Sequence, residues 1–366
     1  MTYATALVSL AAFAKGALSC GLGLPPSHLL GARNLGHHEK RDTLHPINPD
    51  NQVHWTVAQN TRQMQSADDA FIARDFAHFN HHSNSTMYYT GGVVMNLTEH
   101  IEDLRLTFST YSDAAPHNHN YRVIFGEGDW TVALAKAGGV NDGPLPDLSG
   151  NWLPPTERTI SFDLMTISRW NGGMMMEEYL WSDSPAMYRQ LGVLPVRPEA
   201  DLPDIELNPY TTPLSTNPKV DNAAGNKAKM AESDDALNAG KFDAKSLHLS
   251  PDLQVYGLTD RPLDLKEFLK QLKDLKKAFP DLHLENRPYR QVIAQGDWTA
   301  TVAMLSGTFK GPLTLPLYLA SAPVKPNGNK FDLLHYTICR WQGGKIVDMR
   351  INADVFGIMG SLGIPL

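Results

Sequence analysis

The sequence repeats a set of motifs in the same order, and the central motifs recur 168 positions apart. The first copy contains Tyr121-Arg122, Gly128-Asp129-Trp130-Thr131 and Gly143-Pro144-Leu145, and the second contains Tyr289-Arg290, Gly296-Asp297-Trp298-Thr299 and Gly311-Pro312-Leu313. Upstream, Asp68-Asp69-Ala70 returns as Asp234-Asp235-Ala236, and downstream Arg169-Trp170-Asn171-Gly172-Gly173 returns as Arg340-Trp341-Gln342-Gly343-Gly344. A unit of this length can bury a core of its own, whereas the short repeats of solenoids cannot. The pattern therefore predicts duplication of a complete small domain.

Composition limits the classes of partner. The 366 residues carry a formal net charge of −7 with 42% hydrophobic residues, as expected of a globular protein. An acidic chain without clusters of Lys and Arg offers nucleic-acid phosphates no counter-charge. We expect no nucleic-acid partner and no membrane partner.

The N-terminus predicts secretion. Residues 4–14 are apolar but too few to span a bilayer, and Ala17-Leu18-Ser19 has the small residues that a signal peptidase reads. We predict a signal peptide at 1–19, with a buried or frayed N-terminal helix as the alternative, and a possible propeptide at 20–41 that ends in a dibasic pair. Asn84 and Asn96 begin glycosylation acceptor motifs, which fits a secreted glycoprotein.

The remaining chain divides into two units and a linker. We predict the first domain at 42–195, a Pro-rich linker at 196–221 and the second domain at 222–366. Cys20 and Cys339 are the two cysteines of the chain, so a single bridge and two free thiols both stay open.

Each unit is predicted to place helices before strands. Apolar residues at helical spacing, with Asp264 as a cap and Pro280 as a stop, indicate a helix over 265–279, and a similar stripe runs from Ile101 to Tyr111. Strands are expected at 121–125, 130–136, 159–170 and 174–181, joined by Gly-containing hairpin turns. The fold class is therefore α+β, with a curved antiparallel sheet on helices and a conical cavity at its open end.

The ordered motifs, from the Tyr-Arg strand through Gly-Asp-Trp-Thr and Gly-Pro-Leu to Arg-Trp-x-Gly-Gly and an acidic strand, resemble the SnoaL-like polyketide cyclases. This family belongs to the nuclear transport factor two-like superfamily of cone-shaped α+β barrels. The resemblance covers both units and implies two tandem cones. It also implies aldol-type ester cyclase chemistry by an acidic general acid/base, with no cofactor and no metal. Relatives that dehydrate, isomerise or only bind keep the function open.

Asp163 and Glu178 are our predicted catalytic pair. A carboxylate in an apolar pocket can remove a proton next to a carbonyl, since burial raises its pKa. With a two-residue turn at Gly172-Gly173, both carboxylates are expected on one face of the hairpin, whereas a three-residue turn would bring Glu177 there instead. The alternative is that both carboxylates are solvated outside the cone.

Other side chains are predicted to line this pocket. The candidate substrate-binding residues are His117, His119, Tyr88, Trp181 and Met165. His81-His82 could suggest a metal site, as could His117 and His119, which share a strand face, but no acidic third ligand has a recognisable spacing, so we expect no metal site. Asp183 is interpreted as a helix N-cap rather than an acid, by analogy with its counterpart Asp354.

The two units differ at the proposed acidic positions. Glu178 aligns with Met349 and Asp163 with Leu334, so we expect the working pocket in the first unit and a mainly structural second unit. The two units are expected to form an intramolecular pseudo-dimer, so that a monomer suffices. The sequence predicts a secreted protein that acts by cofactor-free cyclisation, dehydration or isomerisation on a small polyketide-like or aromatic carbonyl compound. A non-catalytic carrier with the same cavity is the alternative.

Overall fold

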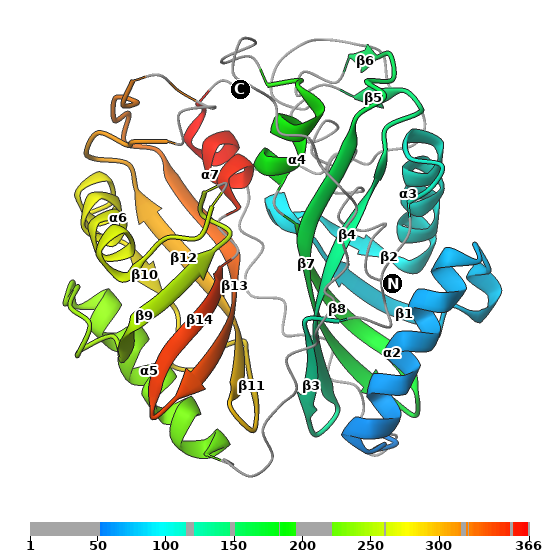
Figure 1. Cartoon of the computed structure of the whole chain (residues 1–366), viewed down its shortest axis with the longest axis horizontal. Coiled ribbons are helices and arrows are strands. Elements are labelled where there is room, and N and C mark those ends of the chain that lie inside the picture. Colours follow the sequence, from blue (N-terminus) through cyan, green and yellow to red (C-terminus); the bar gives the residue numbers. More distant parts are fainter. Residues whose placement is uncertain are drawn as a thin grey trace.

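The computed structural model describes residues 52–114, 121–146, 151–182, 184–194, 222–259, 261–315, 320, 322–351 and 354–364. The predicted signal peptide, propeptide and linker lie outside these residues. Two halves stand side by side, each a sheet with its long helices on the outer side, so that the two sheets face each other across the middle (Figure 1). Among the described residues, no helix is long and apolar enough to cross a bilayer.

The first half contains one six-stranded sheet with the order β2-β1-β8-β7-β4-β3. Its elements are α2 (Val57–Ile72), β1 (His81–Tyr88), β2 (Val94–Asn96), α3 (Leu97–Thr110), β3 (Val123–Glu127), β4 (Trp130–Val140), β7 (Thr159–Asn171), β8 (Met174–Ser182) and α4 (Ser184–Leu191). A separate two-stranded ribbon joins β5 (Leu145–Pro146) and β6 (Trp152–Leu153).

The second half repeats this arrangement. Its elements are α5 (Ala223–Asn238), β9 (Leu249–Tyr256), α6 (Leu265–Ala278), β10 (His283–Leu284), β11 (Gln291–Gln295), β12 (Trp298–Thr308), β13 (Lys330–Gln342), β14 (Lys345–Ile351) and α7 (Val355–Leu362). The strands β11, β12, β13, β14 and β9 are paired in the same order as β3, β4, β7, β8 and β1. The α+β class and the paired units are confirmed, and the agreement of strand order supports a tandem duplication.

The order of elements within each half differs from the prediction in one respect. A strand, β1 or β9, lies between the two long helices and pairs in parallel with the last strand, β8 or β14. The first half thus runs helix, strand, helix before its antiparallel hairpins. The helix predicted at 265–279 is confirmed as α6, and the Asp264 side chain accepts a hydrogen bond from the Glu267 amide at 2.8 Å.

The repeated Gly-Pro-Leu motif docks the end of a long helix. The amide of Gly143 donates to Thr110 O at 3.1 Å, and the amide of Gly311 donates to Ala278 O at 3.0 Å. A Cβ atom on Gly311 would lie 2.1 Å from the carbonyl oxygen of Lys277. Only glycine permits this approach, so the motif is needed by the fold in both halves.

The other repeated motifs make matching buried hydrogen bonds. The indole of Trp170 donates to Thr131 Oγ1 at 2.8 Å, and that of Trp341 donates to Thr299 Oγ1 at 2.9 Å. The Gly-Asp-Trp-Thr and Arg-Trp-x-Gly-Gly motifs therefore tie β4 to β7 and β12 to β13.

An apolar cluster joins the two sheets. It contains Val123, Phe125, Val132, Leu134, Met165, Ile167, Tyr179 and Trp181 from the first half, and Ile293, Trp298, Ala300, Val302, Tyr336 and Ile338 from the second. We call this the sheet–sheet interface, and the opposite side of each sheet the helix side. Phe125 stacks on Trp298 with ring centroids 6.2 Å apart, and Tyr179 meets Tyr336 edge-on at 6.0 Å.

Hydrogen bonds across this interface are reciprocal. The Gly126 amide donates to Gln295 Oε1 at 2.8 Å, and the Ala294 amide donates to Glu127 Oε2 at 2.9 Å. Gly126 and Ala294 occupy matching places in the two copies, as do Glu127 and Gln295. Such reciprocity is what a two-fold relation between two similar units produces.

Candidate functional site

The predicted catalytic pair is split between the two sides of the first sheet. The hairpin turn has two residues, as one prediction required, because Asn171 pairs with Met174. A β-bulge follows at once, since Trp170 pairs with Met175 whereas Arg169 pairs with Glu177. The extra residue reverses the facing of all later side chains, so Glu178 pairs with Ser168 and lies on the helix side. The expectation that Asp163 and Glu178 share a face is therefore wrong.

Asp163 belongs to the sheet–sheet interface. Its carboxylate forms an ion pair with the guanidinium of Arg350 from the second half, and a second one with Lys136 Nζ at 3.2 Å. Its side chain is 16% exposed. A carboxylate held by two cations in this way is an interface contact rather than an acid in an apolar pocket.

Three of the predicted pocket residues also face the second half. Met165 and Trp181 are cross-strand partners within the sheet–sheet interface. Tyr88 stacks on Tyr179 at 4.7 Å, and the guanidinium of Arg290 lies 4.6 Å from the Tyr88 ring. The prediction that these side chains line a cone interior is wrong, because strand alternation carries them to the other side of the sheet.

The remaining predicted residues have separate outcomes. His117, His119 and Asp183 lie outside the described residues, as does Cys20, whereas Cys339 is fully buried. Asp354 caps α7, as predicted, and accepts from the Gly357 amide at 3.1 Å.

Of the predicted site residues that the structure describes, Glu178 is the one that lies inside the first half. The residue is fully buried, and burial raises the pKa of its carboxyl well above the usual range. It lies beside His81, whose Nε2 is 3.8 Å from Glu178 Oε2. The side chain therefore sits in a closed polar cluster rather than on the wall of an open cavity.

The second half contains a cavity of about 360 Å³. Its lining is mainly apolar and comes from α5, α6, β9, β12, β13 and β14, including Leu237, Phe268, Leu272, Leu305 and Met349. This volume suits a small molecule with one or two rings. The expectation that the second unit is mainly structural missed this cavity, and Met349, which replaces Glu178 in this copy, is one of its walls.

Asp234 is a buried acidic group of this cavity. It projects from α5, is 6% exposed, and accepts a hydrogen bond from the Tyr289 hydroxyl at 2.5 Å. Burial raises the pKa of the Asp234 carboxyl to about 7, against the lowering effect of the Tyr289 hydrogen bond. A carboxyl with this pKa is divided between its acid and base forms near neutral pH.

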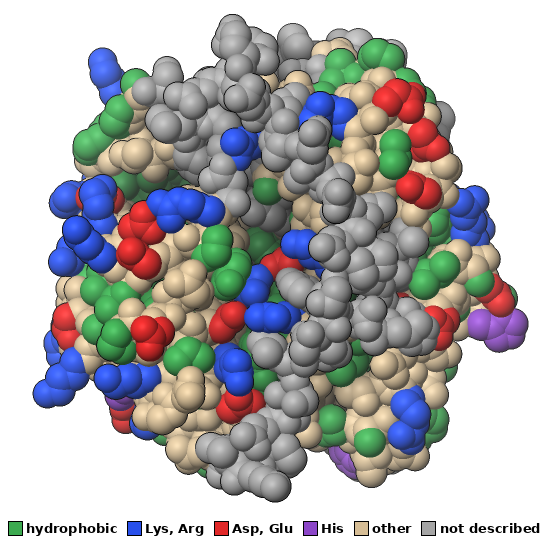
Figure 2. All heavy atoms as spheres, viewed as in Figure 1, with side chains coloured by type: hydrophobic (Ala, Val, Ile, Leu, Met, Phe, Trp, Pro, Cys, Tyr) green, Lys and Arg blue, Asp and Glu red, His purple; other side chains and the backbone are tan. Residues whose placement is uncertain are grey.

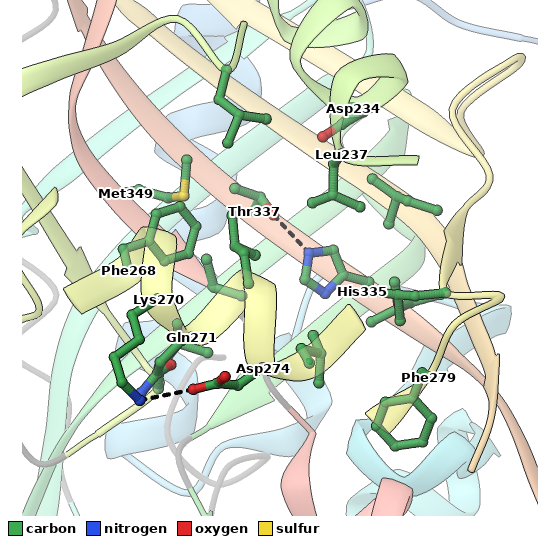
Figure 3. A pocket seen from close by; sticks show the side chains of 18 of the residues that line it. Asp234, Leu237, Phe268, Lys270, Gln271, Asp274, Phe279, His335, Thr337 and Met349 are labelled. Carbon is green, nitrogen blue, oxygen red and sulfur yellow. Dashed lines mark hydrogen bonds and ion pairs between the residues drawn. The ribbon is translucent and has the colours of Figure 1, made fainter. Parts of the chain in front are cut away.

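His335 from β13 adds a second polar group to the same cavity. Its Nε2 lies 3.0 Å from Thr337 Oγ1, two residues along the strand (Figure 3). Lys270 and Asp274 of α6 form an exposed ion pair of 2.8 Å at another part of the lining. Asp234 and His335 thus offer a buried carboxyl and an imidazole to a mainly apolar space.

Comparison with known proteins identifies a family match within the second half. A family model described as SnoaL-like polyketide cyclase matches residues 229–362, which span α5 to α7. The second half is a SnoaL-like domain. The first half repeats its strand order and motifs, so the SnoaL-like fold describes both halves. The match supports a function of the cyclase or isomerase type in general.

Solved structures are similar at low identity. AclR from Streptomyces galilaeus, described as a hydroxylase, is 26% identical over 35% of this chain and 74% of its own, with a TM-score of 0.29. A protein from Jannaschia sp. CCS1 described as a SnoaL-like polyketide cyclase is 20% identical over 39% and 95%, with a TM-score of 0.33. IdmH from Streptomyces antibioticus, described as a polyketide cyclase, is 22% identical over 38% and 98%, with a TM-score of 0.30. No curated protein sequence matches the chain.

The raised pKa of Asp234 predicts how the free energy of unfolding depends on pH. The folded carboxyl has a pKa of about 7, whereas the ordinary value is 3.8, so between these pH values the folded state keeps a proton that the unfolded state has lost. Stability from this group is complete below about pH 4 and is lost as the pH rises through 7. Asp234→Asn does not titrate, so its stability relative to wild type is expected to rise between pH 4 and pH 7 and then level off. Urea unfolding across this range measures the difference, and a difference that does not vary with pH contradicts the assignment.

Proposed function

We propose that the second half binds a small apolar carbonyl compound in its cavity and transfers protons on it without a cofactor, with Asp234 as the general acid/base. One observation carries this proposal: a carboxyl with a pKa near 7 borders an apolar cavity large enough for such a compound. A general base works best when its pKa lies close to the working pH. The SnoaL-like family match to this same half agrees with chemistry of this class.

The groups on the cavity wall supply what aldol-type chemistry requires. Ionised Asp234 removes a proton from the carbon next to a carbonyl, and the electron pair moves onto the carbonyl oxygen as an enolate. His335 or Thr337 can donate a hydrogen bond to that oxygen, since both line the cavity. The enolate carbon then attacks a second carbonyl of the same molecule, and the alkoxide formed takes the proton from Asp234. Dehydration and isomerisation begin with the same proton transfer.

A second candidate function is binding without chemistry. The hydrogen bond between Tyr289 and Asp234 has a counterpart in the first half, where the Tyr121 hydroxyl donates to Asp68. A feature present in both copies serves the fold of both. If Asp234 is held only for packing, the second half is a carrier for the same apolar ligand.

Two expectations from the sequence belong to this proposal. We propose that the sheet–sheet interface replaces a homodimer contact, supported by its apolar area and its reciprocal hydrogen bonds. We also propose that the protein is secreted, and the apolar N-terminal run and the glycosylation acceptor motifs support this proposal.

Acidic and basic side chains are intermixed over the described residues on the face shown in Figure 2.

Occupation of the cavity can be tested with an uncharged fluorescent probe, N-phenyl-1-naphthylamine. We expect one molecule to bind per chain with a rise in fluorescence, because the lining is mainly apolar. Met349→Trp fills the cavity and is expected to weaken binding at least about tenfold. Met174→Trp is the matched control, since Met174 is 38% exposed on the other half of the chain. Equal binding by the two variants would place the probe elsewhere and remove the basis of the proposal.

A further inference from the structure

Three metal-binding side chains meet inside the first half. His81 comes from β1, His100 from α3 and Glu178 from β8, and one ligand atom of each lies within 4.8 Å of the others. They are far apart in the sequence and are brought together by the parallel pairing of β1 with β8 and by the packing of α3 on β1. This cluster belongs to neither the cavity of the second half nor the sheet–sheet interface.

All three side chains are enclosed and incompletely bonded. The side chains of His81 and Glu178 are 1% and 0% exposed, and His100 is fully buried. Within the part of the chain that the structure describes, Nε2 of both imidazoles and both carboxylate oxygens of Glu178 have no hydrogen-bond partner. Buried polar atoms without partners are costly, and several such atoms gathered at one point indicate that something else satisfies them.

The other imidazole nitrogens are already bonded. Nδ1 of His81 donates to Phe79 O at 2.5 Å, so its Nε2 presents a lone pair toward Glu178. Nδ1 of His100 is hydrogen-bonded to the Tyr89 hydroxyl. The Phe79 ring stacks on both imidazoles, with centroid distances of 4.6 Å and 5.6 Å, and fixes their planes. An imidazole held through Nδ1 by a backbone or side-chain oxygen, with Nε2 left open, is the usual arrangement of a metal-ligating histidine.

We propose that His81, His100 and Glu178 bind one divalent transition-metal ion, of which Zn²⁺ is the first to test. Two imidazoles and one carboxylate are a common ligand set for zinc, with bonds of roughly 2.0–2.2 Å. Ligands around a tetrahedral ion lie about 3.3 Å apart, so the ligand atoms must approach one another by up to about 1.5 Å from their separations in the structure. This site differs from the sequence-based expectation, because the acidic ligand lies far from both histidines in the sequence.

The full chain, stripped with a chelator and dialysed, provides the test. Titration with Co²⁺ is expected to produce the intense visible absorption of a four- or five-coordinate ion at one equivalent per chain. Zn²⁺ should abolish this absorption by displacement and should raise the Tm. His81→Gln and Glu178→Gln are each expected to weaken binding at least about a hundredfold, because each removes one of three protein ligands. His78→Gln is the control, since the His78 side chain is 80% exposed and forms its ion pair with Asp75 at the surface.

The outcomes separate a metal site from a shared proton. If wild-type protein binds neither Co²⁺ nor Zn²⁺ in a one-to-one ratio, the cluster is a proton-sharing network and the proposal is wrong. If His78→Gln loses the absorption as well, the ion binds elsewhere on the surface, which also overturns it. Tyr89→Phe keeps all three ligands and removes only the hydroxyl at His100, so it should fold and bind with about 10- to 100-fold lower affinity. Its result decides the question if the ligand variants do not fold.

Discussion

Replacing Asp234 with asparagine is expected to remove most of the proton-transfer activity of the second half. A general base contributes about 10²- to 10⁴-fold to a rate, and asparagine keeps the shape of the side chain while losing the ability to take a proton. The measurement uses 2-tetralone, a bicyclic ketone with acidic protons next to its carbonyl, as a probe. In D₂O, NMR follows the exchange of these protons for deuterium. We expect wild-type protein to exceed the buffer rate and Asp234→Asn to approach it.

Asp68→Asn supplies the matched control for this experiment. Asp68 is buried in the first half and accepts a hydrogen bond from Tyr121, as Asp234 does from Tyr289. The control therefore carries the same structural change away from the cavity, and its exchange rate should equal that of wild type. If Asp234→Asn retains the full rate, Asp234 is not the base. If wild-type protein binds the ketone but never accelerates exchange, the carrier function is favoured.

Replacing Trp298 with alanine is expected to destabilise the protein by about 3–5 kcal/mol. The Trp298 side chain is fully buried in the sheet–sheet interface, where it stacks on Phe125. Its indole nitrogen has no hydrogen-bond partner among the residues that the structure describes, so the expected loss comes from packing and not from a broken polar contact. Urea unfolding, followed by tryptophan fluorescence and circular dichroism, measures the change.

Trp130→Ala is the natural comparison, because Trp130 holds the same position in the first copy of the motif. Trp130 is only partly buried and packs against the edge of the same cluster, with its ring centroid 6.2 Å from that of Tyr179. We expect a loss of about 1–2 kcal/mol there. Equal losses at the two positions would show that the interface is not where Trp298 exerts its effect.

Much of the fold was predictable because the sequence contains two copies of the same ordered motifs. The Gly-Asp-Trp-Thr and Gly-Pro-Leu motifs recur at one spacing, and the structure gives each copy the same hydrogen bonds. Capping by Asp264 was equally readable, since a side-chain acceptor before an apolar helical stripe acts through local geometry. The strand between the long helices was not predicted. In the two halves this strand is β1 or β9, and its parallel partner, β8 or β14, is distant in the sequence. No local sequence pattern predicts a pairing of this kind.

The site was less predictable because it depends on register. The two-residue turn at Gly172-Gly173, one of the two alternatives left open by the sequence, is the one observed, yet one bulged residue in β8 places Glu178 on the helix side and leaves Asp163 at the interface. A change of one residue reverses every later facing, and Met174, Met175 and Met176 give no periodicity that would reveal it. The predicted burial of Glu178 with a raised pKa agrees with the structure, although its neighbours are histidines and not an open pocket.

The cavity of the second half was missed for a related reason. The comparison of copies followed the acidic pair on β7 and β8, and the loss of that pair suggested a structural role. The relevant acid lies on α5, where Asp234 belongs to a motif found in both copies and therefore looked purely structural. The sequence did contain one usable signal, which is a difference between the two copies. The second copy keeps the acid, Asp234, but has Met349 in place of Glu178, and both side chains line the cavity.

The covalent joining of the two halves has a consequence for how such a protein can evolve. In a homodimer every substitution appears at two symmetry-related places, so a change that improves one active centre alters the other equally. Here the partners of the sheet–sheet interface are encoded by separate codons, and Trp298 can remain buried while Trp130 drifts toward solvent. The interior of each half can therefore change independently of the other. This independence accounts for a cluster of two histidines and a glutamate in the first half and a mainly apolar cavity in the second.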